Sequence, residues 1–99
     1  MAVKVLIKRT LKGDDLKAAS RLLINARRGA MSEKGYISSE NLLSVDNPKM
    51  FVVASNWQKL EDWENWKKSE ARKENEKEFS ELLAKPTEYE IYEMGFTME

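Results

Sequence analysis

The sequence predicts a single α+β domain over residues 1–99, in which the elements follow the order β-α-β-β-α-β. Three observations predict this class. Segments near both ends alternate apolar and polar residues with a period of two, which is typical of strands. Two longer segments repeat apolar residues at steps of three and four, which is typical of amphipathic helices. Finally, an apolar segment that ends at Trp57 leads directly into the second of these helices.

The first strand is expected over residues 2–9, because β-branched residues occupy every second position of VKVLIK. Gly13 then interrupts the pattern, and Asp14 and Asp15 supply a candidate N-cap and negative charge for the first turn of a helix. This helix is expected to end between Gly29 and Ser32. Its apolar face consists of Leu16, Ala19, Leu23, Ala26 and Ala30.

The middle of the chain predicts two strands joined by a turn. The second strand is expected over residues 35–45 and the third over residues 50–57. The residues between them, Asp46, Asn47 and Pro48, are typical of turns.

The last third of the chain predicts one continuous helix over residues 59–84, which ends before Pro86, and a final strand over residues 88–94. The complete order of elements is the ferredoxin-like pattern. It is an antiparallel sheet that carries both helices on one face.

The third strand has apolar side chains on both faces. One face carries Phe51, Val53, Ser55 and Trp57, and the other carries Met50, Val52, Ala54 and Asn56. Two helices cover only one face of a sheet, so something else has to cover the second face. We therefore expect a homodimer that packs sheet against sheet. The alternative is a central strand whose second face stays partly exposed.

Composition excludes several functions. The chain has 17 basic and 17 acidic residues, and this balance gives no electrostatic attraction to nucleic acid or to an anionic membrane. It has no cysteine and no histidine, so thiol chemistry and the commonest metal ligands are excluded and no metal site is expected. No segment has the length and hydrophobicity of a signal peptide or a membrane span, which predicts a cytoplasmic protein.

Three tryptophans, Trp57, Trp63 and Trp66, fall within ten residues of the third strand and the following helix. Such a cluster is either a bulky corner of the core or the wall of a pocket for a flat apolar ligand. Leu60 shares the helical face of Trp63 and Trp66. The polar segment 67–78 that follows is either a solvated, ion-paired surface or a helix that stands off the sheet above a cavity. In the second case its polar groups come from Arg72, Asn75 or Glu76.

The segments GYISSENLLSVDNPKMFVVAS, NWQKLEDWENWKKSEARKE and KPTEYEIYEM together resemble the antibiotic biosynthesis monooxygenase (ABM) family. The most recognisable element is Trp57 at the end of a strand, followed by Trp66 and by Ser69 three residues later. The resemblance covers nearly the whole chain. It implies a dimeric α+β barrel with a ferredoxin-like protomer and a pocket between the sheet and the helices.

Two branches of that family are distinguished by single residues. Haem-degrading members carry an Asn in the first strand, a Trp on the second helix and an iron-binding His ten residues later. Here only Trp66 matches, because Glu76 stands at the histidine position and the first-strand position falls near Ile7. The resemblance therefore argues against haem degradation.

The other branch consists of cofactor-independent monooxygenases that act on planar aromatic phenols such as anthrones. By this resemblance Trp57, Trp63 and Trp66 line a substrate slot, and Tyr36, Asn25 or Asn56 orients a substrate oxygen. Arg72 stabilises a substrate enolate, and Glu76 is a candidate base. No cofactor is required. Each residue also has a structural interpretation: the tryptophans as core, Arg72 as a surface ion pair and Tyr36 as a strand residue.

Two other classes of function are compatible with this order of elements. A non-catalytic homodimer of the same fold either binds a small apolar or aromatic molecule or has a filled core. RNA-recognition modules share the order of elements, and Phe51 and Trp57 resemble their base-stacking aromatics. The basic-glycine-aromatic signature is missing, however, since Met50 follows Lys49. Nucleic-acid binding is therefore not expected.

Overall fold

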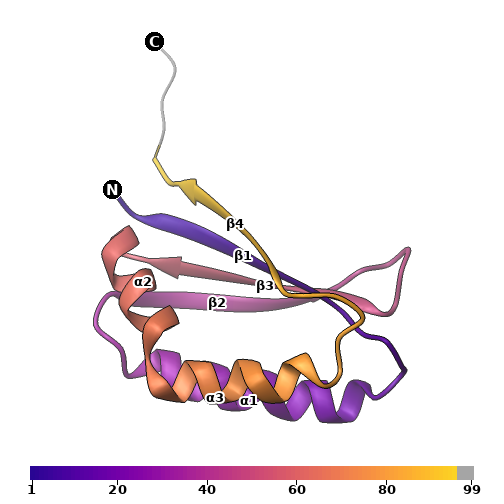
Figure 1. Cartoon of the computed structure of the whole chain (residues 1–99). Helices are drawn as coiled ribbons and strands as arrows, with labels where there is room; N and C mark the ends of the chain where they lie inside the picture. The colour runs from indigo at the N-terminus through magenta and orange to yellow at the C-terminus, as the bar shows by residue number, and fades with distance from the viewer. Residues whose placement is uncertain (96–99) are drawn as a thin grey trace.

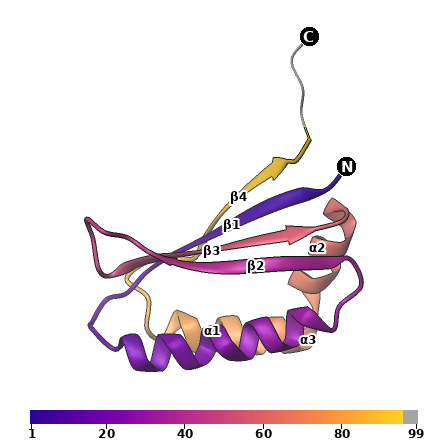
Figure 2. The ribbon, with the colours of Figure 1, turned by 180° about the vertical axis from the view of Figure 1, so that it is seen from behind.

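The computed structural model describes residues 1–95 and consists of two layers, a four-stranded sheet and a layer of helices on one of its faces (Figure 1). The strands are β1 (Val3–Thr10), β2 (Tyr36–Leu43), β3 (Met50–Trp57) and β4 (Glu88–Glu93). The helices are α1 (Leu16–Met31), α2 (Leu60–Lys68) and α3 (Glu70–Ser80). Seen from behind, α1 and α3 again lie side by side under the sheet, and α2 stands at one end (Figure 2). The predicted α+β, ferredoxin-like fold is confirmed.

The sheet is antiparallel throughout and has the order β2-β3-β1-β4. Buried and half-buried residues alternate strictly along β1, and the buried ones are Val3, Val5, Ile7 and Arg9. This alternation points every second side chain of the central strand at the helices. The strands begin and end within two residues of their predicted bounds, and a register shift interrupts β2 between Tyr36 and Ser38.

The N-cap of helix α1 is Asp15, one residue after the expected Asp14, so the expected negative charge in the first turn is absent. The Asp15 carboxylate accepts a hydrogen bond of 3.0 Å from the backbone N–H of Ala18, which satisfies one of the free donors of the first turn. At the other end, the N–H of Ser32 donates to the carbonyls of Gly29 and Ala30.

The expectation of one continuous second helix over residues 59–84 is wrong, because the helix is divided at Ser69. Ser69 has extended backbone angles (φ −65°, ψ 151°), and its hydroxyl accepts a 3.2 Å hydrogen bond from the N–H of Arg72. Serine is a strong N-cap, so a new helix starts here without glycine or proline. Helix α3 also ends early, at Ser80, and Leu83 pairs with Leu11 instead.

The buried residues of the two helices differ from the predicted stripe. Trp63 and Trp66 of α2 are buried, but Leu60 is 43% exposed and does not extend their apolar face. In α3, Arg72 and Asn75 are buried together with Phe79. The polar segment is therefore not simply a solvated surface.

The second face of the sheet is covered by no helix in the described part of the chain. Ala54 is buried among its neighbours, Leu6 and Val52 are half-buried, and Leu42 and Tyr92 are about half exposed. The Lys8–Glu90 ion pair, 2.9 Å long, lies on the same face. We call this surface the open face. Its central strip is apolar, as the sequence of β3 predicts.

The turn before β2 depends on Gly35, which has a φ of +85°. A Cβ atom at this position would lie 2.0 Å from Oδ2 of Asp62, a buried side chain of α2. We expect Gly35→Ala to lower the free energy of unfolding by about 1–3 kcal/mol, because it combines left-handed strain with a steric clash. Urea denaturation measures this, and Gly13→Ala, where a Cβ meets nothing within 4 Å, is the control. Equal stability of the two variants would contradict the prediction.

Candidate functional site

A cavity of about 40 Å³ lies between the sheet and the helices. All three helices and strands β1, β2 and β3 contribute to its walls. The apolar lining comes mainly from Ile7, Val53, Trp57, Trp63 and Trp66, and the polar lining from Arg9, Tyr36, Ser39, Asn41, Ser55 and Arg72. A volume of this size holds one or two water molecules or one small functional group.

The aromatic wall is a chain of rings that crosses from β2 to β4. Tyr36 meets Trp57 edge to face at 5.5 Å between ring centroids, Trp57 meets Trp63 at 6.1 Å, and Trp63 meets Tyr89 at 5.9 Å. Trp57 and Trp63 are each 1% exposed. The indole N–H of Trp57 donates to the Ser55 hydroxyl at 3.2 Å, so its one polar group is satisfied. These tryptophans are both part of the core and part of the cavity wall.

Trp66 completes the wall because α1 leaves room for it. A Cβ atom on Gly29 would lie 2.7 Å from Cη2 of the Trp66 ring. Only glycine at this position allows the helix backbone to approach the indole so closely. The ring is 5% exposed and lies within the same cluster as Trp57 and Trp63.

The carboxylate of Glu76 connects the charged groups next to the cavity. Its Oε1 accepts a 2.7 Å hydrogen bond from Nη2 of Arg9 and lies 3.5 Å from Nη1 of Arg72. Its Oε2 accepts a hydrogen bond from the Thr87 hydroxyl. Arg72 in turn donates from Nη2 to the hydroxyl of Tyr89 at 2.7 Å. Both guanidinium groups are held in fixed positions as a result.

Arg9 is a site residue that our sequence analysis missed. It is 3% exposed, and its guanidinium lies 3.9 Å from the centre of the Phe79 ring. Burial lowers the pKa of Arg9, and the Glu76 carboxylate opposes that shift. One signal was available in the sequence: Arg9 follows Val3, Val5 and Ile7 at steps of two, which places it on the helix-covered face of β1.

Five of the eight predicted site residues line the cavity: Tyr36, Trp57, Trp63, Trp66 and Arg72. Glu76 lies one contact away, behind the two arginines. Asn56 does not reach the cavity, because its side chain lies on the open face and donates to the Ser38 hydroxyl at 3.0 Å. Asn25 lies on α1 beside a different depression, near Glu78 and Leu82.

Within residues 1–95, no three potential ligands among Asp, Glu, His and Cys are grouped to hold a metal ion. Over the same residues, no helix is both long enough and apolar enough to cross a membrane. The expectations of a cofactor-free and cytoplasmic protein stay predictions.

The fold and the cavity define a ferredoxin-like α+β protein with an aromatic-walled site between its layers. The family model for antibiotic biosynthesis monooxygenase matches residues 2–77, which is most of the chain. The chain therefore belongs to the antibiotic biosynthesis monooxygenase family.

Solved structures agree with this fold. A conserved protein from Methanosarcina mazei Go1 is 24% identical with a TM-score of 0.86, over 93% of this chain and 91% of that one. A putative antibiotic biosynthesis monooxygenase from Nitrosomonas europaea is 17% identical with a TM-score of 0.88, over 99% of this chain and 94% of that one. SnoaB, a cofactor-independent oxygenase from Streptomyces nogalater, is 12% identical with a TM-score of 0.83, over 98% of this chain and 96% of that one. No curated protein matches the chain significantly.

Proposed function

We propose that this protein is a cofactor-independent monooxygenase for a planar aromatic phenol of the anthrone type. One observation carries the proposal: the buried guanidinium of Arg72 and the indoles of Trp57, Trp63 and Trp66 line the same cavity. An anthrone that loses a proton to solvent gives an electron-rich anion, which reacts with O2 directly and ends as the quinone and one water molecule. The protein then has only to orient that anion and to stabilise its charge. The likeness to SnoaB supports the proposal at the level of the fold, because SnoaB is a cofactor-independent oxygenase with the same fold.

The residues divide these tasks between them. Trp63 and Trp66 contact the faces of the substrate rings, and Tyr36 orients an oxygen through a hydroxyl that already lies 2.8 Å from the Ser39 hydroxyl. Arg72 stabilises the enolate. The geometry favours a positioning role for Glu76 over the role of a base, because hydrogen bonds from Arg9 and Thr87 occupy both of its oxygens.

The cavity has to widen before it admits fused rings. Its volume of about 40 Å³ is far below the roughly 300 Å³ or more of typical ligand pockets. Helix α2 is the wall that carries Trp63 and Trp66, and the extended residue Ser69 separates it from α3. Rotation of α2 about Ser69 would move both indoles and would open the contacts of Trp63 with Trp57 and Tyr89. The small volume also favours a second candidate function, a non-catalytic protein that binds a smaller aromatic molecule.

The experiment that tests the proposal follows tryptophan fluorescence and oxygen consumption together while a panel of anthrones and planar polyphenols is added. Saturable quenching with oxygen uptake is expected. Arg72→Met should remove most of the oxygen uptake and keep part of the quenching, and the exposed Lys73→Met on the same helix is the matched control. Quenching without uptake in the wild type would support the binding protein instead. The absence of both quenching and oxygen uptake would reject both functions for these compounds.

We also propose that two copies pack open face to open face as a homodimer. The apolar centre of the open face supports this, since Leu6 of β1 lies beside Val52 and Ala54 of β3 and no helix of the described residues covers them.

A charge at the centre of the open face tests the homodimer. Leu6 is half-buried there, opposite Ala54 on β3 and Glu90 on β4. We expect Leu6→Arg to convert the dimer into a monomer of 11.5 kDa, because each copy would have to desolvate a long charged side chain in the middle of the interface. Sedimentation velocity measures the mass. Ile24→Arg, on a side chain of α1 that is 53% exposed, should leave the dimer intact. A wild type that already sediments as a monomer at high concentration would reject the interface.

A further inference from the structure

The cavity carries an excess of buried positive charge. Arg9 and Arg72 are 3% and 4% exposed, and both line it. In the described part of the chain, Glu76 is the one carboxylate paired with either of them. Two guanidinium groups against one carboxylate leave a charge of +1 beside an apolar, aromatic wall. Buried charges in proteins are normally paired, so this excess calls for a partner.

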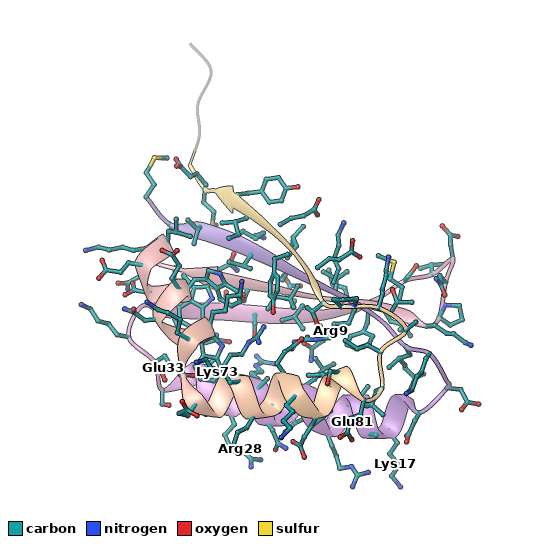
Figure 3. All side chains as sticks on the ribbon, viewed as in Figure 1. Arg9, Lys17, Arg28, Glu33, Lys73 and Glu81 are labelled. Atoms are coloured by element: carbon teal, nitrogen blue, oxygen red, sulfur yellow. The ribbon has the colours of Figure 1, made fainter. Side chains whose placement is uncertain are left out.

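Arg9 also has an unused hydrogen-bond donor. Its Nε is buried and has no hydrogen-bond partner, whereas its Nη2 donates to Glu76. The guanidinium is fixed from below by the Phe79 ring at 3.9 Å, so it does not turn away to find an acceptor. Figure 3 shows Arg9 between the sheet and the helices, while Lys17 and Arg28 on α1 point outward. The orphaned donor thus lies at the site and not at the surface.

We propose that Arg9 is an anion-binding residue, and that the ligand of this cavity is an aromatic molecule that carries a carboxylate. A monoanion neutralises the excess charge of +1, and a carboxylate group is small enough for a space of about 40 Å³. A carboxylate is planar and accepts hydrogen bonds from a guanidinium in the same plane. A water molecule would satisfy Nε but would leave the charge uncompensated.

The neutral polar residues around the cavity fit the same ligand. Ser39, Ser55 and Asn41 line the cavity. Their side chains are neutral, so none of them competes with an anionic ligand for the Arg9 guanidinium as a carboxylate would. The exposed side chain of Arg27 on α1 adds a further positive charge to the lining. This inference rests on the proposed function for the aromatic part of the ligand, because the tryptophans have to receive its rings.

Two matched probes test the inference by isothermal titration calorimetry. 2-Naphthoate and 2-naphthamide have the same shape, but only the first carries a charge at neutral pH. We expect the wild type to bind naphthoate at least tenfold more tightly than naphthamide. Arg9→Met should reduce that ratio to twofold or less without loss of naphthamide binding. Arg9→Lys should keep part of the preference, because it retains the charge and loses the planar donors.

Arg28→Met is the matched control, since it removes one arginine whose side chain points away from the cavity. In this control, the ratio of naphthoate affinity to naphthamide affinity should equal that of the wild type. If Arg9→Met does not fold, as judged by circular dichroism, the wild-type ratio and Arg9→Lys decide the question.

The outcomes separate this inference from the proposed function. Equal binding of both probes to the wild type would overturn anion recognition and leave the aromatic pocket in place. A tenfold preference that survives in Arg9→Met would overturn the role of Arg9. Failure to bind either probe would overturn the inference, and the anthrone oxygen-uptake measurement would then decide the monooxygenase proposal by itself.

Discussion

Replacing Glu76 by glutamine is expected to lower the free energy of unfolding by roughly 3–4 kcal/mol, because removal of one member of a buried ion pair leaves the other charge uncompensated. Here two charges lose their partner. Arg9 and Arg72 are almost fully buried, while the Glu76 side chain is 24% exposed, so some water reaches the site and limits the loss. Glutamine keeps the size of the side chain and one acceptor oxygen. The expected loss is therefore mainly electrostatic.

The measurement is urea denaturation at one fixed protein concentration, because the stability of the proposed dimer would depend on concentration. Glu74→Gln is the matched control, since it makes the same change of charge on an exposed position of the same helix. It should alter stability by less than about 0.5 kcal/mol. The prediction fails if Glu76→Gln and Glu74→Gln are equally stable, which would mean that solvent already screens the arginines.

Local patterns in the sequence were sufficient for most of the fold. The strands follow from alternation, because one face of β1 is buried by helices and the pattern of VKVLIKRT records that burial directly. The start of α1 follows from the pair Asp14 and Asp15 to within one residue, since Asp15 and not the expected Asp14 makes the cap. These elements depend on contacts within a few residues or on the burial of a single face.

The division at Ser69 was not predicted, because the sequence there contains only good helix formers and one serine. Whether a serine inside a polar segment caps a new helix depends on where the preceding helix must end. Here α2 has to place Trp63 and Trp66 over the sheet, and α3 runs beside α1. That constraint is tertiary, and a local pattern does not contain it. Ser69 stands out only through the resemblance to the family.

The candidate site was predictable in part. The tryptophans, Tyr36 and Arg72 line the cavity as predicted. Asn56 does not line it, and the periodicity of the strand was already sufficient to exclude Asn56 from the site. Asn56 directly precedes Trp57, so the two side chains point to opposite faces of β3. The link from Arg9 to Glu76 spans 67 residues, and no spacing rule connects positions that far apart. Only the register of β1 against the helices brings them together.

The largest loss of stability is expected for Phe79→Ala, at about 3–5 kcal/mol. Phe79 is fully buried, packs against Phe51 with ring centroids 6.2 Å apart, and lies under the Arg9 guanidinium. Alanine would remove a hydrophobic group from the centre of its cluster and open a cavity directly beneath a buried charge. Leu82→Ala, at a half-buried position packed against the same cluster, should cost less and serves as the comparison.

The contact between Phe79 and Arg9 has its own energy, which a double-mutant cycle isolates. Phe79→Leu keeps apolar volume but removes the ring face, and Arg9→Met removes the cation. We expect a coupling energy of about 1–2 kcal/mol between the two substitutions, as for a desolvated cation over an aromatic ring. If the two substitutions are additive, Phe79 acts on Arg9 only by filling space. A positive coupling would mean that the hydrophobic core under α3 fixes the guanidinium beside the cavity, so that packing and the charge of the site are set by the same residue.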